Sequence, residues 1–125
     1  MEENEITGLL IGIFIDIHKE LGPGLLESVY EEIIAYELTK RGFPFQRQKA
    51  IGVSYQQVRL ELGFRADFIV NNKVVVEIKS IETVLPVHHK QILTYLRLTG
   101  LKVGLLVNFN VEVLRKGIHR SVNNL

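Results

Sequence analysis

The sequence predicts an α/β fold in which helices flank a small mixed sheet, and three observations support it. Apolar residues recur at helical spacing over residues 6–21, and short stretches rich in β-branched and aromatic residues follow from Phe43. A mainly apolar run then occupies residues 102–109. The predicted order is α-α-β-β-β-α-β. With 125 residues, 46% of them hydrophobic and 23% charged, the chain is expected to form one domain over residues 1–125.

Two helices are predicted in the first third of the chain. The first covers residues 6–21, whose apolar side chains recur every three or four positions, and it ends at the Gly-Pro-Gly sequence of residues 22–24. The second covers residues 25–41, with Gly42 as its cap.

Three strands are predicted next, over residues 43–55, 58–70 and 73–80. Asn71 and Asn72 indicate a hairpin between the last two, because asparagine tolerates the left-handed backbone of short loops. A third helix is predicted over residues 86–100, with Pro86 in its first turn. A buried strand follows at residues 102–109, and residues 117–125 form either an edge strand or a tail.

Composition excludes several classes of protein. The chain has no cysteine, so disulfides and thiolate metal sites are excluded, and a reducing cytoplasmic location is expected. The apolar run at residues 8–17 follows an acidic segment and is interrupted by Asp16 well short of a membrane span. We therefore expect no export and no membrane association.

Charge is unevenly distributed although the formal net charge is only +1. Residues 1–39 hold nine acidic residues and one lysine, whereas residues 40–125 hold fourteen basic and five acidic residues. Such asymmetry is typical of proteins with a polyanion-binding face. It is equally consistent with two segments that neutralise each other where they pack.

The strand at residues 73–80 carries charges in an otherwise apolar run. Side chains alternate along a strand, so Glu77 and Lys79 share one face with Val75. A two-residue loop at Asn71-Asn72 would set Asp67 opposite Val76, whereas a three-residue loop ending at Lys73 would set Asp67 opposite Glu77 and Arg65 opposite Lys79. We predict the second register, or a bulge with the same effect.

Two carboxylates and an ammonium on paired strands suit metal-assisted hydrolysis of a phosphodiester. Carboxylate oxygens bind Mg²⁺ or Mn²⁺ and leave positions for water and a phosphate oxygen. A metal there would activate water, and the lysine would stabilise the developing charge. The structural alternative is an ion pair of Glu77 with Lys79 or Arg65.

Taken in order, these residues resemble the PD-(D/E)xK nuclease superfamily and its restriction-endonuclease-like fold. Asp67 followed by Glu77-Ile78-Lys79 is similar to the motif that gives the superfamily its name, although Ala66 stands where that name has proline. Gln91 and Tyr95 resemble the Q-x-x-x-Y signature of its recombination-exonuclease branch. Residues 24–30, GLLESVY, look like the signature of the small prokaryotic GxxExxY family. The resemblance covers residues 18–125.

The resemblance implies a role for each matching residue. Asp67 and Glu77 would bind the metal together with the Ile78 carbonyl, and Lys79 would be the catalytic lysine. Glu27 would be an accessory acid that binds the metal directly or through water, and it would therefore be both a catalytic and a metal-binding residue. Two further residues, Gln91 and Tyr95, would steady the site or touch the nucleic-acid backbone.

The same residues can also be explained by structural roles alone. Glu27 is a carboxylate favoured at a helix start, and Gln91 with Tyr95 is an amphipathic packing pair. Tyr30 is expected to pack in the core, and His18 to be structural. Adjacent histidines point about 100° apart on a helix, so residues 88–89 are expected to be solvated or to face phosphate and not to bind metal together.

The sequence therefore favours a Mg²⁺- or Mn²⁺-dependent nuclease that acts on nucleic acid, with DNA the expected substrate. Two alternatives remain open: a nucleic-acid-binding module that does not cut, and a structural or interaction domain with a buried ion-pair network. A homodimer is compatible with the sequence, which specifies no interface.

Overall fold

The computed structural model describes residues 1–125, with the side chain of Leu62 outside the description. The helices and strands follow the chain in this order: α1 (Glu3–Leu21), α2 (Glu27–Lys40), β1 (Phe45–Tyr55), β2 (Val58–Val70), β3 (Val74–Lys79), α3 (Pro86–Thr99), β4 (Val103–Asn108), η1 (Leu114–Gly117) and β5 (Ile118–Val122). The α/β fold and the order of its first seven elements agree with the prediction. The segment left open as strand or tail contains the strand β5, and the 3₁₀ turn η1 had no counterpart in the prediction.

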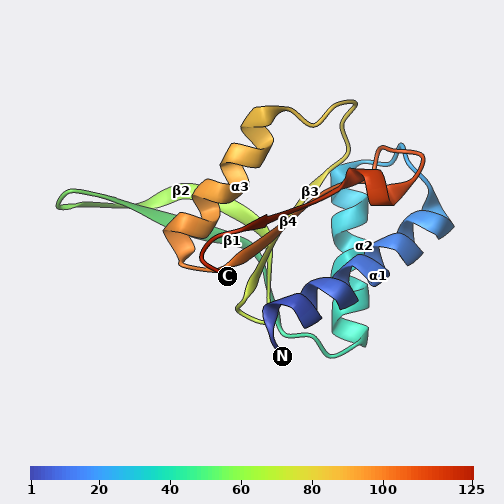
Figure 1. Ribbon diagram of the computed structural model, residues 1–125, viewed down its shortest axis with the longest axis horizontal. Helices are drawn as coiled ribbons and strands as arrows, with labels where there is room; N and C mark the ends of the chain where they lie inside the picture. The colour runs from blue at the N-terminus through green and yellow to red at the C-terminus, as the bar shows by residue number, and fades with distance from the viewer.

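The five strands form one mixed sheet in the order β1-β2-β3-β4-β5. Only β3 and β4 are parallel, and the neighbouring pairs are antiparallel. Parallel neighbours need a long crossover, and α3 supplies it between β3 and β4. Figure 1 shows α1 and α2 on one side of the sheet and α3 on the other, with the β1–β2 ribbon extending beyond the rest of the molecule.

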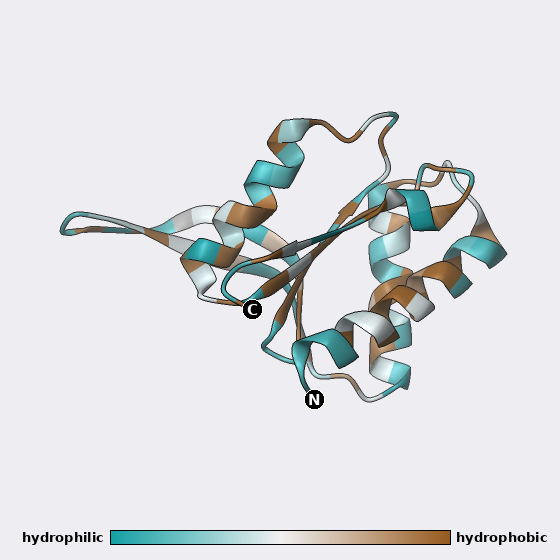
Figure 2. Cartoon of the chain, viewed as in Figure 1, coloured by the Kyte–Doolittle hydropathy of each residue, from teal (hydrophilic) through white to brown (hydrophobic). Residues whose placement is uncertain are grey.

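Two apolar clusters, one on each face, bury the sheet. The larger joins α1 and α2 to alternate residues of the central strands, including Val74, Val76 and Ile78. The smaller joins α3 to the other face and includes Val75. The centre of the sheet is accordingly hydrophobic in Figure 2, while the helices carry both hydrophobic and hydrophilic residues. The predicted alternation along β3 is thus confirmed.

The loop before α2 is held by a buried tyrosine. The Tyr30 hydroxyl donates to the Gly22 carbonyl (2.6 Å) and accepts from the Leu25 N–H (3.3 Å), and its ring stacks on Phe109 at 4.3 Å between centroids. Because these bonds fix residues 22–26 as a loop, α2 begins at Glu27 and not at the predicted residue 25. Tyr30 is a core residue, as expected.

His18 has the structural role predicted for it. It is buried, and its Nε2 lies 2.7 Å from the Val111 carbonyl, which ties α1 to the segment after β4. Among the described residues, no helix is long and apolar enough to cross a membrane.

Candidate functional site

Asp67 and Glu77 meet where the backbone pairing of β2 with β3 ends. The pairs Phe68–Val76 and Val70–Val74 enclose a three-residue loop, so the predicted register is confirmed. Beyond the pair Phe68–Val76, hydrogen bonds from backbone N–H groups to the two carboxylates take the place of backbone–backbone hydrogen bonds between the strands. The Asp67 N–H donates to Glu77 Oε1 (3.2 Å), and the Ile78 N–H donates to Asp67 Oδ2 (2.8 Å). The two acids therefore face each other across the strands.

Burial perturbs both acids. Glu77 is only 7% exposed, and burial, followed by the charge of Asp67, raises its pKa to about 8. Burial also raises the pKa of Asp67, against the lowering effect of the hydrogen bond from the Ile78 N–H. Like charges close together disfavour double ionisation, and a cation between them would relieve this. The pair is therefore electrostatically suited to a positive ion.

Lys79 belongs to the same surroundings. Its side chain is half-buried, and its charge lowers the pKa of both Asp67 and Glu77, although less than burial raises them. Within the described part of the chain, no ion pair joins Glu77 to Lys79 or to Arg65, which was the structural alternative. Arg65 instead donates to the Gln48 carbonyl at 3.2 Å.

Ile78 lies between the two charged residues of β3. Its side chain is buried in the cluster below α1 and α2, and its N–H is the one that holds Asp67. The role of its carbonyl as a metal ligand stays a prediction.

Glu27 opens α2 and contacts the end of β3, not the acid pair. Its Oε2 accepts the Ser80 N–H at 3.1 Å, and Ser80 Oγ donates to the Leu25 carbonyl at 2.6 Å. Both residues line an open cleft of about 550 Å³ together with Gly24 and Asn110. Among the interactions of the described residues, none joins Glu27 to Asp67 or Glu77.

Tyr95 approaches the acid pair from α3, whereas Gln91 has no partner among the described side chains. Tyr95 is 4% exposed and packs on Phe64 with 5.1 Å between ring centroids. Burial, then the charges of Glu77 and Asp67, raises its pKa to about 12. Gln91, one turn earlier, is half-buried. Tyr95 therefore both packs in the core and lies close to the two acids.

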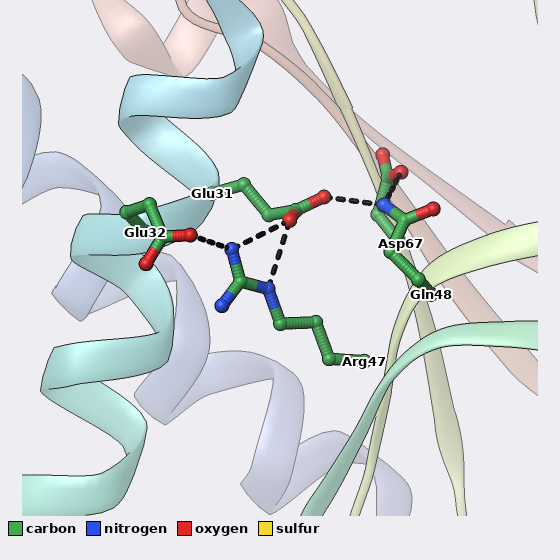
Figure 3. Close-up of polar contacts among 5 residues, drawn as sticks. All are labelled: Glu31, Glu32, Arg47, Gln48 and Asp67. Atoms are coloured by element: carbon green, nitrogen blue, oxygen red, sulfur yellow. Dashed lines mark hydrogen bonds and ion pairs between the residues drawn. The ribbon is translucent and has the colours of Figure 1, made fainter.

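Sequence reasoning missed two residues beside Asp67, drawn in Figure 3. The Gln48 amide donates to Asp67 Oδ1 at 3.0 Å and also to Glu31 on α2. Glu31 lies four residues after Glu27 on the same face of a helix, so helical spacing could have identified it. No sequence signal marks Gln48, because its position depends on an unusual backbone conformation.

The donor set determines which metal fits. Among the described residues, no group of three or more histidine, cysteine, aspartate or glutamate side chains is arranged to hold a metal ion. Zinc sites generally use three or four such ligands. Mg²⁺ is commonly bound through one or two carboxylates and keeps several waters, so Asp67 and Glu77 fit Mg²⁺ or Mn²⁺ better than zinc.

The fold agrees with what a family comparison finds. Residues 4–121 match the model of the PD-(D/E)XK nuclease superfamily, and the chain belongs to that superfamily. Searches against curated proteins and solved structures found no match. The narrower assignment to the GxxExxY family stays a prediction.

Proposed function

We propose that this protein is a Mg²⁺- or Mn²⁺-dependent nuclease that hydrolyses phosphodiester bonds, with DNA as the expected substrate. The observation that carries the proposal is the pair Asp67 and Glu77, a half-buried and a buried carboxylate that face each other across paired strands in a chain of the PD-(D/E)XK superfamily. Ionised carboxylates are costly to bury without a counter-charge. A divalent cation supplies that charge.

In this proposal Asp67, Glu77 and the Ile78 carbonyl hold the cation. When bound, it polarises the phosphodiester and lowers the pKa of a coordinated water. Lys79, on the same face of β3 as Glu77, would orient the attacking water or stabilise the negative charge that develops on the phosphate. Glu27, which lines the neighbouring cleft beside Ser80, serves as an accessory acid through water.

Tyr95 acts in this scheme as a donor and not as a base. Its raised pKa of about 12 keeps the hydroxyl protonated at neutral pH. A protonated hydroxyl beside two carboxylates can donate to a carboxylate, to water or to a phosphate oxygen. Gln91, one helical turn away, steadies the same side of the site or contacts the nucleic-acid backbone.

The charge distribution supports nucleic acid as the substrate. Among the described residues, ion pairs between the acidic helices and the sheet involve only Arg47, so the two segments do not largely neutralise each other. Exposed bases remain on the side of α3 and on the β1–β2 ribbon: Lys49, Arg59, Lys90, Arg97 and Lys102, of which Arg59 pairs with Glu61 at 3.1 Å. Contacts from such residues to phosphates would make binding weaken as salt increases.

Calorimetric titration with Mg²⁺ and Mn²⁺ tests the metal site before any substrate is known. The wild type should bind, and Asp67→Asn and Glu77→Gln should each lose most of the binding. Cleavage is then measured on single-stranded, duplex and branched DNA and on RNA, with and without metal. A wild type that binds neither ion, even with an oligonucleotide present, would refute the proposal.

A nucleic-acid-binding module that does not cut is the second candidate. The exposed bases on α3 and the ribbon favour it, because they can bind phosphates independently of the acid pair. Salt-dependent DNA binding that is unchanged in Asp67→Asn, with no metal-dependent cleavage by the wild type, would support this candidate over the nuclease.

A further inference from the structure

Gln48 has a backbone conformation that its residue type disfavours. The pairs Arg47–Phe68 and Lys49–Ala66 place it directly opposite Asp67, yet its φ is 52°, in the left-handed region. Such a conformation is unfavourable for a residue other than glycine and persists only where the surroundings enforce it. The strain points to a role for the side chain.

The Gln48 side chain uses its amide nitrogen to hold two carboxylates. It donates to Asp67 Oδ1 at 3.0 Å and to Glu31, as Figure 3 shows. The other oxygen of Asp67 already accepts the Ile78 N–H. Both oxygens of this carboxylate are therefore fixed, one by β3 and one by β1, which fixes the orientation of its plane.

Glu31 is anchored in turn by Arg47. Arg47 Nε donates to Glu31 Oε2 at 2.8 Å, and the same guanidinium pairs with Glu32. A continuous chain of polar contacts thus runs from α2 through β1 to Asp67 (Figure 3). Glutamine is suited to the central position because one neutral amide nitrogen can donate to two carboxylates.

We propose that Gln48 is a positioning residue that orients Asp67 for a divalent cation and couples that ligand to Glu31 on α2. This inference rests on the proposed metal site. Groups that hydrogen-bond to metal ligands fix their orientation, and losing one typically costs about 10–100-fold in metal affinity. The same residue keeps a strained backbone, so stability and metal binding are expected to change in opposite directions when it is replaced.

Gln48→Gly separates the two effects. Glycine accepts the left-handed backbone without strain but has no amide to donate. The matched control is Gln56→Gly, since Gln56 has the same φ of 52° but lies in the turn between β1 and β2. Gln48→Asn is a second variant: asparagine tolerates the left-handed region and keeps the amide on a side chain one carbon shorter.

The experiment measures Mn²⁺ affinity by calorimetry and thermal unfolding without metal for each protein. Gln48→Gly should lose about tenfold or more in affinity while its unfolding midpoint stays unchanged or rises. Gln48→Asn should also lose affinity, and Gln56→Gly should keep it. Wild-type affinity in a folded Gln48→Gly or Gln48→Asn variant overturns the positioning role alone. A wild type that binds no Mn²⁺, or an Asp67→Asn variant that binds as well as wild type, overturns the proposed metal site as well.

Discussion

The two faces of β3 differ although one short strand supplies both. Toward α1 and α2 it presents Val74, Val76 and Ile78, all buried among apolar side chains. Toward α3 it presents Val75 and Glu77, with Lys79 at the end of the strand. Because side chains alternate strictly, changing one face leaves the other almost intact. A strand can therefore combine a stabilising surface with ionisable groups that are unfavourable to bury.

The largest expected effect is on the charged face. Lys79→Ala should lower metal-dependent cleavage by about 10²–10⁴-fold, the usual contribution of a positioned acid, base or charge. Metal affinity and the unfolding midpoint should change little. Lys73→Ala is the control, because Lys73 lies just before β3 at its opposite end and contacts the Met1 carbonyl. Cleavage that survives in Lys79→Ala would contradict the mechanism.

A change on the apolar face should act on stability. Ile78 is 1% exposed, and Ile78→Ala should lower the free energy of unfolding by about 2–5 kcal/mol through lost burial and a residual cavity. Urea unfolding measures this value. Glu77→Gln, one residue away on the other face, should cost less. The contrast between the two faces would be wrong if Glu77→Gln proved the more destabilising change.

Stability without metal should depend on pH through Glu77. Its pKa in the folded state, about 8, lies above its ordinary value, so between these two values the folded protein keeps a proton that the unfolded chain has lost. Stability should therefore fall as pH rises through this window and then level off above about pH 8. A tenfold change in proton affinity corresponds to about 1.4 kcal/mol, so raising the pKa from 4.5 to about 8 sets an upper limit of about 5 kcal/mol on the total.

Glu77→Gln isolates this pH effect. Burial raises the pKa of Asp67 as it does that of Glu77, so Asp67 changes stability with pH in the same direction. Burial lowers the pKa of His119, so the stability that neutral His119 contributes is lost as pH falls. The wild type should lose stability relative to Glu77→Gln as pH rises toward about 8, and Mg²⁺ should reduce that loss. Urea midpoints measured at several pH values would show it. Parallel pH profiles for the two proteins would contradict the assignment.

Tyr95→Phe should have the smallest effect. The ring and its packing on Phe64 are kept, so the free energy of unfolding should change by less than about 1 kcal/mol. Cleavage or metal affinity should fall a few-fold if the hydroxyl serves the acid pair. A variant identical to wild type in both would favour the packing interpretation of Gln91 and Tyr95.

Local patterns predicted most of the fold and the centre of the site. Helical spacing identified α1, Pro86 marked the first turn of α3, and the charges within β3 identified Glu77 and Lys79. The register followed from loop length, because one residue more or fewer would move Asp67 away from Glu77. What could not be predicted depends on tertiary contacts. Gln48 has a left-handed backbone conformation that only its tertiary surroundings can enforce. The hydrogen bonds of Tyr30 to the loop before α2 place the first residue of the helix later than predicted.

The three-residue loop between β2 and β3 also bears on the order of folding. Asp67 and Glu77 belong to one hairpin, so little loop-closure entropy opposes their meeting. The parallel pairing of Val76 with Leu105 must instead wait for the whole α3 crossover. We therefore expect the two acids to come together early, while still hydrated. Their desolvation, and with it the perturbed proton affinity of Glu77, should arise only in the late step that docks α3 on the sheet.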